Sequence, residues 1–261
     1  MTLPRDEYLA QKRNFTIPHD IFSISVRKAK PKGWHILNKN RFIGDAKTHW
    51  KNKEEDTSAC DCKPPQDFEQ QLGCGDFCVN RAMQYECNAA NCRLPPKMCG
   101  NRPFANLAAR LKKGGAYNVG VEIIETANRG YGVRACRSFA AGEIVMEYTG
   151  EIITEYECQR RIREDYSYAE CFYIMGLAHG LLIDGMKGNV GRFINHSCQP
   201  NCEVRMLTVD GKLRLGVFAG EDGVPAGTEL TYDYNYETCA GPPLKCHCGT
   251  PSCRGFLTKR R

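Results

Sequence analysis

The sequence has no apolar run approaching the ~20 residues that a membrane-spanning helix needs. Residues 1–10 carry charged side chains and no apolar segment, so we expect no signal peptide there. Internal repeats and low-complexity tracts are also missing. These absences favour a soluble chain inside the cell with no membrane partner. Its 261 residues, 42% of them hydrophobic, suffice for one core of domain size plus appendages that need other support.

Charge is unevenly distributed along the chain. Residues 1–53 hold 12 Lys and Arg against 4 Asp and Glu, a surplus of 8 that leaves −2 for the rest of a chain of net charge +6. Such a segment is attracted to phosphate through counterion release. We therefore predict that residues 1–57 form an extended basic arm with few packed contacts that meets nucleic acid. A solvated leader without a partner is an equal alternative.

The chain contains sixteen cysteines. In a reducing compartment, dense cysteines indicate metal sites rather than disulfides. Seven lie in a block that has little aliphatic material to form a core: Cys60, Cys62, Cys74, Cys78, Cys87, Cys92 and Cys99. Seven thiolates can hold two zinc ions if one sulfur is shared. The alternative is a set of buried structural thiols.

A second cysteine cluster lies near the end of the chain. Cys246, Cys248 and Cys253 supply three thiolates, and Cys198 is the candidate for the fourth ligand of a third zinc ion. Such an ion would clip the C-terminal tail across the body of the protein. We expect the remaining cysteines to be small buried side chains or free thiols: Cys136, Cys158, Cys171, Cys202 and Cys239.

Short strands are predicted from Val119 onward. Residues 121–125 and 143–148 are rich in β-branched and aromatic residues, and Asp210-Gly211 predicts the turn of a hairpin over residues 205–218. The clearest helix covers residues 154–165, because Thr154 can cap it and its charges suit the helix dipole. The pattern indicates a β-rich α+β fold.

Four motifs resemble those of SET-domain lysine methyltransferases. They are Gly191 to Cys202 (GRFINHSCQPNC), Glu229 to Asn235 (ELTYDYN), Gly130 to Val133 (GYGV) and Glu147 to Glu151 (EYTGE). The seven-cysteine block is similar to the AWS (associated-with-SET) domain, and the C-terminal cluster to the post-SET zinc clip. The resemblance implies a SET fold of small curved sheets with a C-terminal pseudoknot. The implied domains are 1–57 arm, 58–105 AWS, 106–236 SET and 237–261 post-SET.

The resemblance also implies roles for individual residues. Tyr234 would be the catalytic tyrosine, with Tyr232 and Tyr173 beside it. The cofactor S-adenosyl-L-methionine would be bound by Arg129, Gly130, Tyr131, Tyr173, Arg192, Phe193, Asn195 and His196, with Leu244 and His247 near its adenine. Tyr131 stands where tryptophan is common in this family, and Leu244 stands where glutamine is frequent.

Methyl transfer requires a neutral lysine amine aligned with the donor methyl group. Bringing an amine of pKa about 10.4 to the neutral form near pH 7.4 costs roughly 4 kcal/mol, and a dry aromatic channel lowers that cost. Tyrosine suits such a channel because its ring excludes water while its hydroxyl makes one directed bond. In the family that the sequence resembles, the position of Tyr232 limits how many methyl groups fit, so we expect mono- and dimethylation.

An AWS block points to the branch, similar to the Ash-one type, that methylates the lysine-36 position of histone H3 in the nucleosome. The expected location is then the nucleus and chromosome, with nucleosomal DNA meeting the basic arm. Phe15 to Pro18 (FTIP) resembles a docking motif for an MRG-domain partner, and residues 237–244 are expected to border and gate the substrate groove. The alternatives are a catalytically weak SET-like scaffold, a methyltransferase for another histone H3 lysine, and a zinc-dependent nucleic-acid binder.

Overall fold

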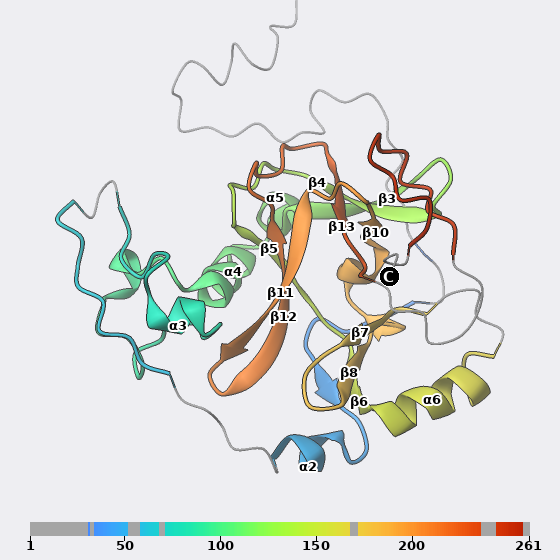
Figure 1. Cartoon of the computed structure of the whole chain (residues 1–261), viewed down its shortest axis with the longest axis horizontal. Coiled ribbons are helices and arrows are strands. Elements are labelled where there is room, and N and C mark those ends of the chain that lie inside the picture. The colour runs from blue at the N-terminus through green and yellow to red at the C-terminus, as the bar shows by residue number, and fades with distance from the viewer. Residues whose placement is uncertain are drawn as a thin grey trace, which may run out of the picture.

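A computed structural model of the chain describes residues 31, 34–51, 58–67, 71–167, 172–235 and 244–257 (Figure 1). Most of the predicted basic arm lies outside these residues, including the Phe15 to Pro18 motif. Cys171, Cys239 and residues 237–243 lie outside them as well. None of the helices in the described ranges has the length and apolar character that crossing a bilayer requires.

Strands dominate the described part of the chain. They are β1 (His35–Ile36), β2 (Arg41–Phe42), β3 (Val121–Glu125), β4 (Tyr131–Ala135), β5 (Ile144–Tyr148), β6 (Glu151–Thr154), β7 (Ile174–Gly176), β8 (Leu181–Asp184), β9 (Lys187–Gly188), β10 (Asn195–His196), β11 (Cys202–Val209), β12 (Lys212–Ala219) and β13 (Glu229–Tyr232). The α-helices are α2 (Ala46–Lys51), α3 (Val79–Ala82), α4 (Pro103–Lys112), α5 (Gly115–Val119) and α6 (Glu155–Glu164), and η2 (Pro96–Met98) and η3 (Val190–Phe193) are 3₁₀ turns. The β-rich prediction is confirmed.

The strands form small separate sheets rather than one large sheet. Their orders are β10-β13-β4-β3, β11-β12-β5, β2-β6-β8-β7 and the pair β1-β9. Strand β13 runs parallel to β10, with Asn195 opposite Thr231 and His196 opposite Tyr232. This pairing places the GRFINHSCQPNC and ELTYDYN motifs side by side, as the expected SET fold requires. The largest apolar core lies beneath it and includes Val133, Ile194 and Leu230, none of them exposed.

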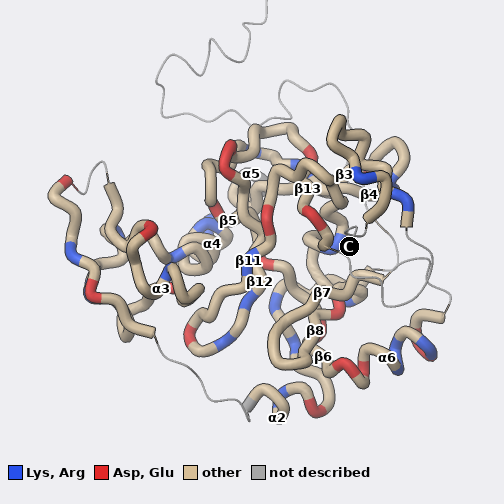
Figure 2. Tube along the Cα trace, viewed as in Figure 1, with Lys and Arg blue, Asp and Glu red and all other residues tan. Residues whose placement is uncertain are grey.

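The predicted hairpin and helix are both present. Asp210 and Gly211 adopt φ of 48° and 71° between β11 and β12, the left-handed conformations of a tight hairpin turn. Thr154 caps α6 by accepting a hydrogen bond from the Glu157 amide. Figure 2 shows acidic residues at the start of α6 and basic residues toward its end. Its charges therefore interact favourably with the helix dipole, as the sequence predicts.

The expectation of an arm with few packed contacts is wrong for residues 34–51. Strand β1 pairs with β9, β2 pairs with β6, and Ala46 of α2 is fully buried. Two polar contacts fix this segment: the Thr149 hydroxyl donates to the Leu37 carbonyl, and the Gly150 amide donates to Asn40 Oδ1. The segment therefore adds two strands to the sheets of the main body. Its polar composition does not predict this, because the strand edges of β6 and β9 with which it pairs form only when the chain folds.

Helix α4 is a second feature that the sequence did not predict. Its first amides, of Phe104 and Ala105, donate to Glu86 Oε1 at 2.6 and 3.1 Å. The cap therefore comes from a residue far back in the chain, within the cysteine-rich block. Phe104 and Leu107 bury the inner face of α4 against Ile144 and Phe218. This helix joins the cysteine-rich block to the central sheets (Figure 1).

Candidate functional site

An aromatic wall surrounds Phe193, which is itself almost fully buried. The rings of Trp34, Tyr131 and Tyr173 lie 5.0, 5.7 and 6.4 Å from that of Phe193, centroid to centroid. The Arg192 guanidinium stacks 4.0 Å above the Tyr173 ring. Residues from four separate parts of the sequence thus build one amphipathic surface, on which a cationic or π-rich ligand is favoured. Trp34 was not predicted, because it lies outside every motif.

Asn195 lies at the edge of this wall and has a defined orientation. Its amide nitrogen donates to the Tyr131 carbonyl at 3.0 Å and to Glu229 Oε1 at 2.9 Å. The other carboxylate oxygen of Glu229 accepts from Arg129 at 2.7 Å. Because both amide hydrogens are engaged, the Asn195 side chain presents its carbonyl oxygen to a ligand. Glu229 stands inside a predicted motif, yet the sequence alone did not assign it this role.

The ring of His196 is held on both nitrogens by protein groups. Nδ1 accepts from the Tyr234 amide at 3.2 Å, and Nε2 lies 3.4 Å from the Cys198 sulfur. Burial lowers the pKa of His196, although the nearby Asp233 carboxylate raises it. The imidazole is therefore neutral at physiological pH and connects the strand carrying Tyr234 to the C-terminal cluster. Any direct contact with a cofactor would come from the His196 backbone.

Tyr232 and Tyr234 pack in the same core cluster as Phe193, and the hydroxyl of a third tyrosine, Tyr148, donates to the Tyr173 carbonyl at 3.3 Å. The rings of Tyr232 and Tyr234 are 5.0 Å apart, and the Tyr234 hydroxyl donates to the Ile194 carbonyl at 2.8 Å. Burial, with a smaller effect from Tyr148, raises the pKa of Tyr232 well above its usual value. Burial, with a smaller effect from Tyr234, likewise raises the pKa of Tyr148. Both phenols are therefore neutral at physiological pH. Tyr148 lies in a quoted motif, but its approach to Tyr234 depends on how β5 packs.

The C-terminal cysteines fold back onto Cys198. The Sγ atoms of Cys198, Cys246, Cys248 and Cys253 all lie within 4.8 Å of one another. A tetrahedron with Zn–S bonds of 2.3 Å has sulfurs about 3.8 Å apart, and the Cys198–Cys246 distance is 3.7 Å. The donor set and spacing therefore fit zinc. Arg254 ties this cluster to the site, because its backbone amide donates to Cys198 and its side chain pairs with Asp233 at 2.8 Å.

The AWS-like block gathers its cysteines into two overlapping groups. One group is Cys60, Cys74, Cys78 and Cys87, and the other is Cys74, Cys87, Cys92 and Cys99. Cys74 lies 3.8 Å from Cys60 and 3.6 Å from Cys92, close to the sulfur spacing of a zinc tetrahedron. Its φ of 54° is unusual for a residue with a Cβ, so the surroundings hold it there. Cys62 belongs to neither group but packs against them.

Three residues predicted to bind the cofactor, and the cysteines outside the two clusters, are not part of the aromatic wall. Gly130 has a φ of 65° and open space where a Cβ would point, which suits a close ligand approach. Leu244 and His247 are exposed on the tail and make no described contact with the aromatic wall. Among the cysteines outside the clusters, Cys158 and Cys202 are buried and Cys136 is half-buried.

Comparison with protein families identifies two domains. The SET domain model matches residues 130–235, and the AWS domain model matches residues 69–106. Among solved structures, one chain of the Chaetomium thermophilum Polycomb Repressive Complex 2 bound to GSK126 superposes with a TM-score of 0.55. Its identity is 23%, over 69% of this chain and 25% of that one. At that identity the likeness supports the fold alone.

Similar curated proteins agree with these domains. Histone-lysine N-methyltransferase NSD3 of Mus musculus is 39% identical over 88% of this chain and 15% of its own length. The human "Histone-lysine N-methyltransferase, H3 lysine-36 specific" is 38% identical over 88% of this chain and 8% of its own. ASHH1 of Arabidopsis thaliana is 38% identical over 80% and 40%. The chain thus spans less than half of each relative. It belongs to the SET-domain family, in the group that carries an AWS domain ahead of the SET domain.

Proposed function

We propose that the chain transfers methyl groups from S-adenosyl-L-methionine to the lysine-36 position of histone H3 in nucleosomes, giving mono- and dimethyl-lysine. The observation that carries this proposal is the grouping of Tyr232 and Tyr234, 5.0 Å apart, with the Tyr234 hydroxyl on the Ile194 carbonyl between Phe193 and Asn195, and with Tyr148 donating to the carbonyl of Tyr173 in the aromatic wall. The substrate position rests on relatives whose names specify H3 lysine-36. A nuclear, chromosomal location follows from such a substrate.

The cofactor supplies a methyl group activated by a sulfonium. The Asn195 carbonyl oxygen would accept from its ammonium group, with Arg129, Gly130, Tyr131, Tyr173, Arg192, Phe193 and the His196 backbone around it, and Leu244 and His247 toward the adenine. A hydroxyl oxygen that donates to Ile194, as that of Tyr234 does, can still accept from an amine or make a weak C–H···O contact. Burial in a channel of uncharged side chains removes the ammonium ion from water and so disfavours the charged form, which favours the uncharged lysine.

Three zinc ions complete the proposal. Two would lie in the AWS block, one held by Cys60, Cys62, Cys74 and Cys78 and the other by Cys74, Cys87, Cys92 and Cys99, so that Cys74 is the shared sulfur. The third would lie at the C-terminal clip. Each would be structural, because four thiolates leave no open coordination position. The clip would hold the tail against Cys198 and, through Arg254 and Asp233, keep the catalytic strand in place.

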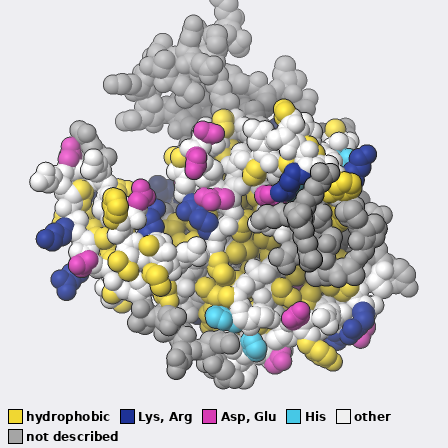
Figure 3. Space-filling view, viewed as in Figure 1, with side chains coloured by type: hydrophobic (Ala, Val, Ile, Leu, Met, Phe, Trp, Pro, Cys, Tyr) yellow, Lys and Arg dark blue, Asp and Glu magenta, His cyan; other side chains and the backbone are white. Residues whose placement is uncertain are grey.

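The histone tail would bind as an added strand. Strand β7 lies at the edge of its sheet, and its far side has no strand partner among the described residues. The sulfur of Met175 in β7 contacts the Tyr232 hydroxyl at 3.7 Å, so a peptide on this edge would pass the tyrosines. Figure 3 shows hydrophobic side chains gathered in a hollow between β7 and the β11–β12 hairpin. The basic arm would contact nucleosomal DNA, and residues 15–18 an MRG-domain partner.

Methylation of recombinant nucleosomes tests the proposed function. We expect label from S-adenosyl-L-methionine on histone H3, mapped by mass spectrometry to the lysine-36 position. Nucleosomes with arginine at that position are expected to lose the label. Undiminished labelling of the arginine nucleosomes would assign another lysine, and no labelling of any histone would favour a catalytically weak scaffold.

Tyr232→Phe is expected to shift the product toward trimethyl-lysine. The Tyr232 hydroxyl lies beside Met175 and next to the Tyr234 ring, where it limits the space around the amine. Removing one oxygen enlarges that space while the ring still excludes water. Mass spectrometry of the product should show a trimethyl fraction that is absent with the native chain and with the surface variant Tyr156→Phe. An unchanged product distribution would contradict this role.

Glu229→Gln is expected to weaken binding of S-adenosyl-L-methionine about tenfold, or about 1.4 kcal/mol, close to the low end of the range for a hydrogen bond to a charged group. Glu229 pairs with Arg129 and orients the Asn195 amide, so the change loosens both residues at once. Calorimetric titration measures the effect, with the exposed Glu221→Gln as the control. Equal affinities of the two variants would exclude Glu229 as a positioning residue.

A further inference from the structure

A cavity is lined by residues that belong neither to the aromatic wall nor to the group of Tyr148, Tyr232 and Tyr234. Its volume is about 460 Å³, within the usual range for ligand pockets. One wall comes from residues 39–50, ahead of both matched domains, and the other from the tip of the β11–β12 hairpin. Four of its twelve lining residues come from a segment outside the family matches and the other eight from residues 130–235, so the cavity is formed between that segment and the SET domain.

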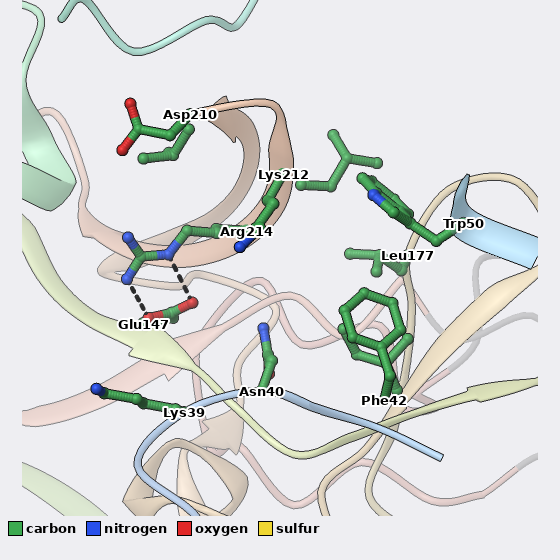
Figure 4. Close-up of a pocket in the computed structure, with 12 residues that line it drawn as sticks. Lys39, Asn40, Phe42, Trp50, Glu147, Leu177, Asp210, Lys212 and Arg214 are labelled. Carbon is green, nitrogen blue, oxygen red and sulfur yellow. Dashed lines mark hydrogen bonds and ion pairs between the residues drawn. The ribbon is translucent and has the colours of Figure 1, made fainter. Parts of the chain in front are cut away.

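The floor and one side of the cavity are apolar. Phe42, Trp50, Ile152, Leu177 and Leu213 line it. Phe42, Trp50 and Leu177 are only partly buried against the core around Tyr148, so their remaining surface faces the cavity. Figure 4 shows the Trp50 ring standing beside Leu177 with its indole nitrogen turned toward the cavity. An occupant that places aliphatic side chains here would remove that apolar surface from water.

The polar groups that face the cavity are mainly donors. Both carboxylates are already engaged: Glu147 accepts two bonds from Arg214, and Asp210 accepts from Asn88 at 2.9 Å. Asn40 uses its oxygen to accept from Gly150, and Figure 4 shows its nitrogen directed into the cavity. Lys39 and Lys212 are exposed and form no ion pair with a described residue. The cavity therefore lacks acceptors for at least two ammonium groups.

We propose that this cavity is a docking site for an acidic, leucine-containing peptide segment of a partner protein. Carboxylates of the segment would pair with Lys39 and Lys212, and its aliphatic side chains would pack on Phe42 and Trp50. Duplex DNA would satisfy the lysines but has no aliphatic group for the apolar floor. The chain's own acidic run, Glu54 to Asp56, likewise carries no apolar side chain. Only a segment that carries both carboxylates and aliphatic side chains matches the two lysines and the apolar floor of the cavity.

Fluorescence anisotropy tests this site with a labelled octapeptide of alternating leucine and aspartate. We expect saturable binding to the full chain, weakened at least tenfold by Lys212→Glu and by Trp50→Ala, the loss typical of a central interface residue. Lys47→Glu is the matched control, because Lys47 is an exposed lysine of α2 that does not line the cavity. It should change affinity by less than about twofold, as surface charges outside an interface do. Lys39→Glu keeps the test valid if Trp50→Ala fails to fold.

Control peptides and a competitor separate the alternatives. Lysine in place of aspartate, or serine in place of leucine, should abolish binding. Equal binding of either control peptide, or an equal effect of Lys47→Glu and Lys212→Glu, would overturn the site. Displacement of the octapeptide by a short DNA duplex would assign the lysines to phosphate instead. Binding that appears only after Glu54, Glu55 and Asp56 are neutralised would assign the cavity to the chain itself.

Discussion

Tyr234→Phe is expected to reduce methyl transfer at least ~100-fold while S-adenosyl-L-methionine still binds. The variant removes only the hydroxyl that donates to Ile194 and that we propose orients the lysine amine. Displacing a reacting group by about 1 Å can cost about 10²-fold in rate. The lost hydrogen bond to Ile194 costs about 1 kcal/mol of stability, which is small beside the 5–15 kcal/mol of a typical domain. The rate should therefore fall far more than the folded fraction.

A matched tyrosine on the surface makes this result interpretable. Tyr156 lies on α6 and is 76% exposed, so Tyr156→Phe should leave both rate and stability unchanged. Single-turnover transfer to nucleosomes gives the rate, and calorimetry gives the cofactor affinity. If Tyr234→Phe retained more than about half of the native single-turnover rate, the hydroxyl would have no part in orienting the amine.

Cys74→Ser is expected to remove both zinc ions of the AWS block and to unfold it. Six of the seven cysteines of the block, with Leu94, make up most of its buried apolar cluster, so little aliphatic burial remains without metal. Structural zinc contributes about 10–16 kcal/mol of apparent binding free energy in small cysteine-rich domains. Cys74 lies between the two groups of thiols and is the expected bridge. Its loss should therefore affect both ions.

Metal analysis of the purified chain measures this effect. We expect about three zinc ions per native chain and about one in Cys74→Ser, because the C-terminal clip is separate. Cys136→Ser, outside both clusters, should keep all of them. Glu86, next to Cys87, caps α4, so loss of the block should also expose α4 and lower the melting temperature. A Cys74→Ser chain with unchanged zinc content would exclude the shared ligand.

Local chemistry explains why part of the fold could be predicted. Asp210-Gly211 specifies its hairpin through left-handed φ angles, and Thr154 specifies its helix through a cap within the same turn. Helix α4 has a proline at its first position as a local signal, but its side-chain cap, Glu86, lies far back in the sequence. Residues 34–51 mislead for a similar reason, since the backbone edges of β6 and β9 that they join are created only by folding.

The functional site, like the fold, could be predicted only in part from the sequence. Asn195 and the C-terminal cysteines lie in motifs whose spacing can be read directly, and the structure gathers Cys198, Cys246, Cys248 and Cys253. Contacts between residues of different motifs could not be predicted from the sequence. Glu229 reaches Asn195 from the neighbouring strand β13, and Trp34 reaches Phe193 from outside every motif. His196 was expected to hold the cofactor. Its ring nitrogens contact Tyr234 and Cys198, so its side chain links the strand before Tyr234 to the C-terminal cysteine cluster.

A crystal structure of the zinc-containing chain with S-adenosylhomocysteine tests the proposed mechanism most directly. We predict that the amino group of the ligand donates to the Asn195 carbonyl oxygen, and that its sulfur faces the space beside Tyr234 and Phe193. Density for the ligand at another place, or a vacant aromatic wall at saturating ligand, would contradict the proposal that this wall and these tyrosines form the methyl-transfer site.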